Sequence, residues 1–254
     1  MEVRTNYIIS NSGVRVWRSP MVHPILQKTN INHPDFLRKA TEEYTRGRVR
    51  GLPKICSENS EDARTWFLFS PLIEKTENQT STLLTLFSQA FPGEIDASIL
   101  HNLQASKLYF WHGKETPTLK LERPPLLPFS QGSTEVDLIV AIENQVVVFV
   151  EAKYRSNVST GVKYAPNWDQ VIRNIDVGSW FANGHFQRFY FILLQYGNYP
   201  SNAESILLSY KDKPEVIRKA LKHRTDLDDQ QISLLARSIA FVRWPDPIDP
   251  FILR

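Results

Sequence analysis

The chain has 254 residues, of which 42% are hydrophobic, and a formal net charge of +3. This length and apolar content allow a real buried core, which excludes a disordered chain. The single cysteine, Cys56, excludes an internal disulfide and a cysteine-rich zinc site, and fits a reducing compartment. No apolar run is long enough for a signal peptide or a membrane span, so we expect a soluble, cytoplasmic protein with no membrane partner.

Residues 1–56 are predicted to be an N-terminal elaboration of a larger domain that spans residues 57–254. Residues 1–60 contain ten Lys or Arg residues but only five Asp or Glu residues. Four of the basic residues share one short Gly- and Pro-containing stretch: Arg46, Arg48, Arg50 and Lys54. Such a patch either neutralises nucleic-acid phosphates without reading a sequence or is a solvated loop, and the sequence leaves both readings open.

The first half of the chain contains several predicted elements. A hairpin is expected over residues 6–17 and a helix over residues 33–45. A further helix over residues 60–73 begins with Ser60, a good N-cap, so that Glu61 lies in its first turn. One or two helices over residues 80–104, an edge strand over residues 107–111 and a proline-rich loop over residues 115–133 follow.

The centre of the sequence is a predicted β-hairpin. Two β-branched apolar runs, Val136 to Ile142 and Val146 to Val150, are separated by Glu143, Asn144 and Gln145. Neither run alternates between polar and apolar residues, so both faces of these strands should be covered, as in the middle of an α/β sheet.

The register of this hairpin decides where its acidic residues lie. A three-residue turn pairs Ile142 with Val146 and places Asp137 opposite Glu151, with their Cβ atoms about 5 Å apart. Lys153 then points to the same face as Glu151. A two-residue turn without a bulge would put the two acids on opposite faces. The interpretation as a site therefore depends on the three-residue turn.

Two facing carboxylates repel each other unless a cation lies between them. Mg²⁺ is the expected cation, because hard divalent ions prefer oxygen ligands and often keep waters for a phosphate substrate. The competing interpretation is that Glu151 and Lys153 form an ordinary surface ion pair at a strand end. The position directly after a buried strand, with Asp137 in register, favours the metal site.

These residues resemble the PD-(D/E)XK nuclease superfamily, which has the restriction-endonuclease-like fold. Asp137 matches the first acid, and Glu151, Ala152 and Lys153 match the tripeptide, whereas Val136 stands where the motif has proline. The resemblance covers roughly residues 58–196. It implies a core of one helix, a three-stranded meander, a second helix and a further strand, which together form a mixed central sheet flanked by helices. It also implies Mg²⁺-dependent cleavage of nucleic acid, with Mn²⁺ as a substitute.

The resemblance suggests two more site residues. In similar nucleases the helix before the sheet often brings a third acid to the metal; Glu61 is the first choice here, with Glu58 and Asp62 as rivals. Similar proteins also often place a glutamine on the helix after the hairpin, and Gln170 lies on the helix that we expect over residues 167–182. In each case the alternative is an ordinary polar role at the helix surface.

Further basic residues near the hairpin are candidates for nucleic-acid binding: Arg155, Lys163 and Arg173. Arg155 and Lys163 belong to a polar stretch, residues 154–166, that we expect to be flexible. Beyond it we predict a buried strand over residues 189–196, helices over residues 214–223 and 229–237, and a last strand over residues 238–244. The glycines lie too far apart for a phosphate-binding loop or a dinucleotide fold.

The resulting expectation is an α/β endonuclease that hydrolyses phosphodiester bonds, with DNA favoured by the resemblance. A role in prokaryotic restriction or defence against foreign DNA, as a homodimer or as a subunit of a complex, is consistent with that family. The alternatives are an RNase, a nuclease that resolves branched DNA, and a non-catalytic nucleic-acid-binding subunit with the same fold.

Overall fold

A computed structural model describes residues 5–74, 77–93, 105–115, 133–142, 144–162, 165–183 and 185–247. The chain divides into two compact units, one of residues 1–79 with residues 245–254 and the other of residues 80–244. The predicted domain boundary between residues 56 and 57 falls inside the first unit and stays a prediction. Among the described residues, no helix combines the length and the apolar character that a membrane span requires.

The first unit is built from short elements. It contains strands β1 (Tyr7–Ile9) and β2 (Arg15–Trp17), helices α1 (Pro34–Ala40) and α2 (Glu61–Phe69), and 3-10 turns at Pro20–Val22, Leu26–Lys28, Lys54–Cys56 and Ser70–Glu74. The predicted hairpin is confirmed, and Gly13 takes the left-handed conformation in its turn, with φ 81°. Ser60 caps α2 as predicted, because its hydroxyl accepts a hydrogen bond from the Ala63 N–H at 3.0 Å. Helix α1 ends at Ala40, earlier than predicted.

The second unit begins within helix α3 (Glu77–Ala90) and holds the main sheet. Its strands are β3 (Lys107–Glu115), β4 (Ser133–Ile142), β5 (Val146–Lys153), β8 (Arg188–Tyr196) and β9 (Ile239–Trp244), and a separate hairpin is made of β6 (Thr160–Val162) and β7 (Ala165–Asp169). The helices are α6 (Gln170–Ala182), α7 (Ala203–Leu208), α8 (Pro214–Ala220) and α9 (Asp229–Arg237).

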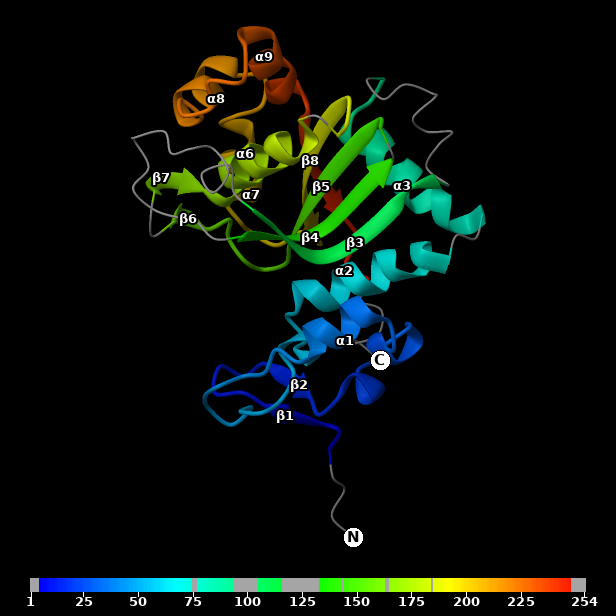
Figure 1. Cartoon of the computed structure of the whole chain (residues 1–254). Helices are drawn as coiled ribbons and strands as arrows, with labels where there is room; N and C mark the ends of the chain where they lie inside the picture. The colour runs from blue at the N-terminus through cyan, green and yellow to red at the C-terminus, as the bar shows by residue number, and fades with distance from the viewer. Residues whose placement is uncertain are drawn as a thin grey trace. The chain divides into compact units, whose positions relative to one another are not determined.

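The main sheet is mixed. Its strand order is β3-β4-β5-β8-β9 (Figure 1). The pairs β3–β4 and β4–β5 are antiparallel, and the pairs β5–β8 and β8–β9 are parallel. Every residue of β5 is buried, which confirms the prediction that this strand is covered on both faces. The prediction of an α/β fold with a mixed central sheet flanked by helices is therefore confirmed.

Helices α6 and α3 pack against opposite faces of the sheet. On one face, Phe149 and Phe189 meet edge to face, and Gly178 of α6 lies so close that a Cβ there would be 2.1 Å from the Phe189 ring. On the other face, Phe91, just after α3, packs its ring 4.7 Å from that of Tyr190. Since Phe189 and Tyr190 are consecutive in β8, their side chains point to opposite faces. The sheet is thus a central layer between helices.

The central hairpin has the predicted register. Ile142 pairs with Val146 and Leu138 with Val150. Asn144 has a left-handed backbone with φ 57°, which a three-residue loop needs and which asparagine tolerates better than most residues. Glu143 lies outside the described residues. The turn length that the metal-site interpretation required is the one that the chain adopts.

The segment after the hairpin differs from its prediction. Residues 165–169 form strand β7, which pairs with β6, so the helix begins at Gln170 rather than at residue 167. Asp169 sets this start, because its side chain accepts a hydrogen bond from the Ile172 N–H at 3.0 Å. Of the later elements, β8, α9 and β9 follow the predictions within one residue, α8 ends at Ala220 rather than at residue 223, and α7 was not predicted.

Candidate active site

The candidate site lies inside the second unit, at the end of β5, where the pairing of β4 with β5 begins. The strand pairing runs to Leu138 and Val150, so Asp137 and Glu151 are the next residues across from each other. Here a side-chain oxygen of Asp137, rather than a backbone carbonyl, is the hydrogen-bond acceptor across the hairpin: its Oδ2 accepts a hydrogen bond from the Ala152 N–H at 2.8 Å. This bond fixes the Asp137 carboxylate beside the Glu151-containing end of β5.

Three side chains donate hydrogen bonds to the Glu151 carboxylate. Lys153 Nζ lies 2.7 Å from Oε1, Gln170 Nε2 also donates to Oε1, and Asn174 Nδ2 donates to Oε2 at 3.3 Å. The cluster is buried, because Glu151 is 3% exposed and Lys153 5% exposed. A charge removed from water is costly unless it is paired and hydrogen-bonded, and here the ammonium group and the two amides supply that compensation.

Helix α6 supplies both amides. Gln170 and Asn174 are four residues apart, so they lie on the same face of the helix, one turn from each other. The structure places Gln170 against Glu151, where the sequence suggested it, but its catalytic role stays a prediction. Asn174 was not predicted as a site residue. Its position one turn after Gln170 is the sequence signal that could have identified it.

Asn174 also carries an unsatisfied acceptor. Its side chain is fully buried, and its Oδ1 has no hydrogen-bond partner among the described residues. The amide orientation that makes the bond to Glu151 puts the nitrogen toward the carboxylate and the oxygen away from it. A buried carbonyl oxygen without a donor costs about 1–3 kcal/mol, so the site contains one oxygen that a cation or a water would satisfy.

The donor chemistry of this site fits a hard divalent ion. Asp137 and Glu151 supply carboxylate oxygens, and Asn174 supplies an amide oxygen. Mg²⁺ is commonly held by one or two carboxylates while it keeps several waters. No group of three or more His, Cys, Asp or Glu side chains suited to a metal occurs in the described part of the chain, so the protein ligands of such an ion would be few.

The predicted third acid belongs to the other unit. Glu61 is the first residue of α2. Its rivals have partners within the same unit: Glu58 accepts a hydrogen bond from the Arg15 N–H at 2.9 Å, and Asp62 lies 3.6 Å from Lys39. The assignment of Glu61 to the metal site stays a prediction.

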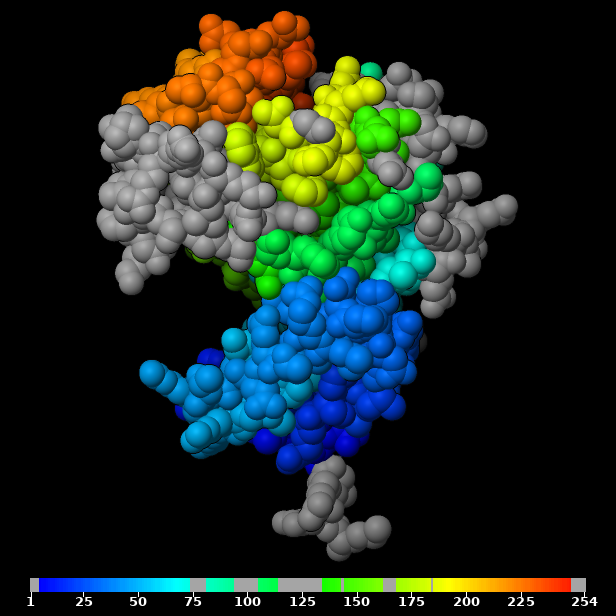
Figure 2. Space-filling model, in the orientation of Figure 1, coloured from blue at the N-terminus to red at the C-terminus, as the bar shows by residue number. Residues whose placement is uncertain are grey.

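The predicted nucleic-acid-binding residues fall into three places. Arg155 is exposed directly after β5, and Arg173 is half-buried on α6, with its Nε lacking a partner within the described ranges. Lys163 lies outside the described residues. The remaining four residues are exposed on one surface segment of the first unit (Figure 2): Arg46, Arg48, Arg50 and Lys54. Backbone hydrogen bonds between residues 42–44 and 51–54 close the base of this segment.

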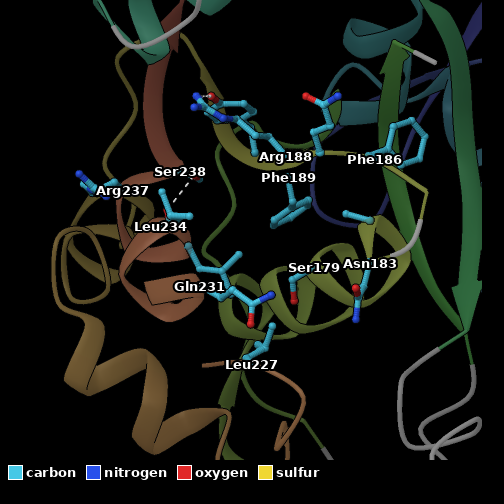
Figure 3. A pocket seen from close by; sticks show the side chains of 14 residues that line it. Ser179, Asn183, Phe186, Arg188, Phe189, Leu227, Gln231, Leu234, Arg237 and Ser238 are labelled. Carbon is cyan, nitrogen blue, oxygen red and sulfur yellow. Dashed lines mark hydrogen bonds between the residues drawn. The ribbon is translucent and has the colours of Figure 1, made fainter. Parts of the chain in front are cut away.

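A cavity of about 500 Å³ lies elsewhere in the second unit (Figure 3). It is formed by the end of α6, the start of β8 and helix α9, and its lining contains Arg188 and Arg237 but no carboxylate. Arg188 pairs with Val146, whereas Lys153 pairs with Gln195 seven residues further along β8, which corresponds to about 23 Å of strand. The cavity is therefore separate from the acid cluster and cannot hold a metal through acidic ligands.

The charge of this cavity does not specify a ligand. The two arginines would attract an anion, but α6 and α9 both end at the cavity, and helix C-termini carry partial negative charge. We therefore place the candidate chemistry at Asp137, Glu151 and Lys153. No protein-family model, curated protein or solved structure matches the chain in sequence or fold comparisons.

Proposed function

We propose that this chain is a metal-dependent nuclease of the PD-(D/E)XK type, with DNA as the favoured substrate. The observation that carries the proposal is the convergence of Asp137, Glu151 and Lys153 at one end of the central hairpin. The mixed five-stranded sheet flanked by helices is compatible with the α/β core that the family resemblance implies, whereas the helix expected to open that core, over residues 60–73, belongs to the other unit.

In this proposal Asp137, Glu151 and the Asn174 oxygen would hold Mg²⁺ or Mn²⁺. The bound ion supplies a water of lowered pKa and offsets negative charge on the phosphate. The donors around Glu151 orient its carboxylate, since Lys153, Gln170 and Asn174 contact it from one strand and one helix. Ligands fixed in this way by neighbouring hydrogen bonds favour a defined coordination geometry.

Lys153 has a second role in the proposal. Its ammonium group is held at Glu151 Oε1 and is nearly buried, in a setting of low dielectric where a fixed positive charge acts strongly. There it positions the attacking water and stabilises the charge that develops on the phosphate in the transition state. Gln170 shares the same carboxylate oxygen and so keeps Lys153 and Glu151 in a fixed relation.

The test is cleavage of plasmid DNA, linear duplex, branched DNA and RNA, each with Mg²⁺ or Mn²⁺ and with EDTA. Asp137→Asn keeps an oxygen that accepts from Ala152 N–H but removes the charge, and Lys153→Gln keeps a donor for Glu151. Each variant should lower cleavage by roughly 10²–10³-fold, the usual loss for one group that stabilises a transition state. Lys213→Gln is the matched control, because Lys213 is an exposed lysine that donates to the Leu208 carbonyl.

Different outcomes separate the proposal from its alternatives. Metal-dependent cleavage of RNA or of branched DNA alone would keep the site and change the substrate. Cleavage in EDTA, or undiminished cleavage by Asp137→Asn and Lys153→Gln, would contradict a metal site at these residues. Nucleic-acid binding without cleavage of any substrate would leave the non-catalytic subunit as the better description.

A further inference from the structure

A compact group of aromatic and basic side chains follows directly after Lys153. The Arg155 guanidinium carbon lies 4.2 Å from the centre of the Tyr199 ring and 5.1 Å from that of Tyr154. Arg155 Nη2 also donates to the Tyr199 hydroxyl at 2.8 Å. The two tyrosine rings meet edge to face, with their centres 5.0 Å apart. Two rings and one hydroxyl thus hold the guanidinium in place.

The two loops that carry this group are tied to each other. Asn202 Oδ1 accepts from the Val158 N–H at 2.7 Å, and Asn202 Nδ2 donates to the Val158 carbonyl at 3.1 Å. Gln195 donates to the Tyr199 carbonyl from inside β8. The loops leave the carboxyl ends of the parallel neighbours β5 and β8, where Lys153 pairs with Gln195. In open α/β sheets this edge is the usual place for ligands.

The backbone at Arg155 is held in an unfavourable conformation. Its φ is 55°, in the left-handed region that costs a residue other than glycine about 1–2 kcal/mol. Such conformations persist where the surrounding structure over-determines them, and they concentrate at binding and catalytic sites. Here the conformation turns the chain immediately after Lys153 and sets Arg155 over the tyrosines.

The arrangement of the rings decides which part of a nucleic acid would bind. Tyr154 is 3% exposed, and Arg155 covers one face of Tyr199, so these rings are engaged within the protein. Arg155 itself is exposed. A guanidinium presents its N–H donors in a planar fork that matches two phosphate oxygens. The group is therefore suited to the nucleic-acid backbone rather than to stacking with a base.

We propose that Tyr154, Arg155 and Tyr199 form a platform that binds a backbone phosphate of the substrate beside Lys153, without regard to base sequence. The proposal rests on the proposed nuclease function, because the platform would bind the strand that the nuclease site cleaves. The tyrosines pre-position Arg155, so that little side-chain freedom is lost when the phosphate binds.

Binding is measured without metal, in EDTA, so that cleavage does not interfere. A fluorescent duplex and a single strand of equal length and several sequences are titrated at a series of salt concentrations. Arg155→Gln should weaken binding by roughly tenfold, the effect of losing one charge-assisted hydrogen-bonded contact. For the duplex it should also flatten the slope of log K against log salt by about 0.9. Arg155→Lys should keep the slope but bind more weakly than the wild type, since a lysine lacks the fork.

The matched control is Arg188→Gln. Arg188 is also an exposed arginine that donates to a tyrosine hydroxyl, that of Tyr190 at 3.2 Å, but it lies at the opposite end of β8. This control should keep the wild-type affinity and slope. Arg155→Gly removes the same side chain while it relieves the left-handed backbone, so it should reproduce the loss in binding with no loss in melting temperature.

The outcomes distinguish this proposal from the nuclease proposal. Wild-type affinity and slope in Arg155→Gln, or equal losses in Arg188→Gln, would overturn the platform even if the protein cleaves DNA. A wild-type protein that binds neither probe would overturn it as well. Binding that depends on Arg155 in a protein that cleaves no substrate would keep the platform and remove the nuclease assignment. A sequence-selective loss would contradict recognition of the backbone.

Discussion

Helix α6 carries two buried acid–base clusters that are built in opposite ways. Near its start, Gln170 and Asn174 contact the Glu151–Lys153 pair; in its second half, Asp176 binds Arg224. Each cluster joins one buried carboxylate to one buried cation. They differ in how completely their polar atoms are satisfied, and this difference separates a structural ion pair from a candidate site.

The Asp176 cluster is fully used for structure. Asp176 accepts from Arg224 Nη1 at 3.1 Å and contacts His223 Nε2 at 3.0 Å. Arg224 also donates to the Ser179 hydroxyl and makes two parallel bonds with Asp226. The bonds from His223 and Arg224 to Asp176 and Ser179 tie the segment before α9 to α6, and the Asp226 bonds hold Arg224 in place. The cluster therefore locks two parts of the fold together, and both Asp176 oxygens are engaged by its cation and by His223.

The polar atoms of the Glu151 cluster are less completely hydrogen-bonded than those of the Asp176 cluster. Its carboxylate is held by one lysine and two neutral amides, which bind less strongly than a bidentate arginine. The Asn174 oxygen has no partner among the residues that the structure describes, and a second carboxylate, Asp137, lies across the hairpin. An incompletely satisfied buried cluster with two acids is the arrangement that the proposed ion site requires.

The largest expected effect on stability comes from a substitution that breaks the Asp176–Arg224 cluster. Arg224→Gln should lower the free energy of unfolding by about 3–5 kcal/mol, because it leaves the buried Asp176 without its cation. Lys153→Gln should cost less than half as much, since Glu151 keeps Gln170 and Asn174 as donors. Urea unfolding of the two variants beside the wild type measures both. Equal losses would show that the two pairs are alike and would weaken the distinction.

The next effect tests ion binding directly. Mg²⁺ or Mn²⁺ at a hundredfold excess over the dissociation constant should stabilise the wild type by about 2.7 kcal/mol, read as a rise in melting temperature. Asp137→Asn should remove most of this gain because it removes a ligand. Asp176→Asn, a matched loss of one buried carboxylate on α6, should lower the melting temperature but keep the metal-induced rise. The same rise in the wild type and in Asp137→Asn would mean that the ion binds elsewhere.

A smaller effect comes from the unsatisfied oxygen. Asn174→Leu removes one weak hydrogen bond to Glu151 but also removes the buried acceptor, so the free energy of unfolding should change by no more than about 1 kcal/mol. The metal-induced stabilisation should fall in the same variant. A loss of several kcal/mol in the metal-free protein would instead make Asn174 a structural residue like Asp176.

The smallest effect is a pH dependence in the structural cluster. Partial burial alone would raise the pKa of Asp226, but the bidentate bond and the charge of Arg224 outweigh burial and hold the pKa below its ordinary value of 3.8. A lowered folded-state pKa gives stability that is present at neutral pH and is lost as the pH falls through that lowered pKa.

Asp226→Asn should therefore cost about 1 kcal/mol at pH 7, the upper range for a pair that solvent reaches. The difference in the free energy of unfolding between this variant and the wild type should vanish in acid. Unfolding by urea at pH 7 and below pH 3.8 compares the two proteins. A constant difference at both pH values would show that the loss comes from packing rather than from the charge.

The sequence by itself determined the features that depend on a few neighbouring residues. The β-branched runs around Asn144 predicted two buried strands but allowed a two- or three-residue turn between them, and the structure has the three-residue register that sets Asp137 across from Glu151. Ser60 and Asp229 marked helix starts at or beside the observed caps. Helix capping acts over two to four residues, so the local sequence contains the information that a cap needs.

Only the tertiary structure decided which distant segments meet. Arg155 reaches Tyr199, and Asp176 reaches Arg224, across 44 and 48 residues of chain. The parallel pairing of β5 with β8 brings the segments after these two strands together, and the packing of α6 against the segment before α9 joins Asp176 to Arg224. Asn174 belongs to the same class: its spacing from Gln170 fixes its face on α6, but only the packing of α6 against β5 makes that face the wall of the site.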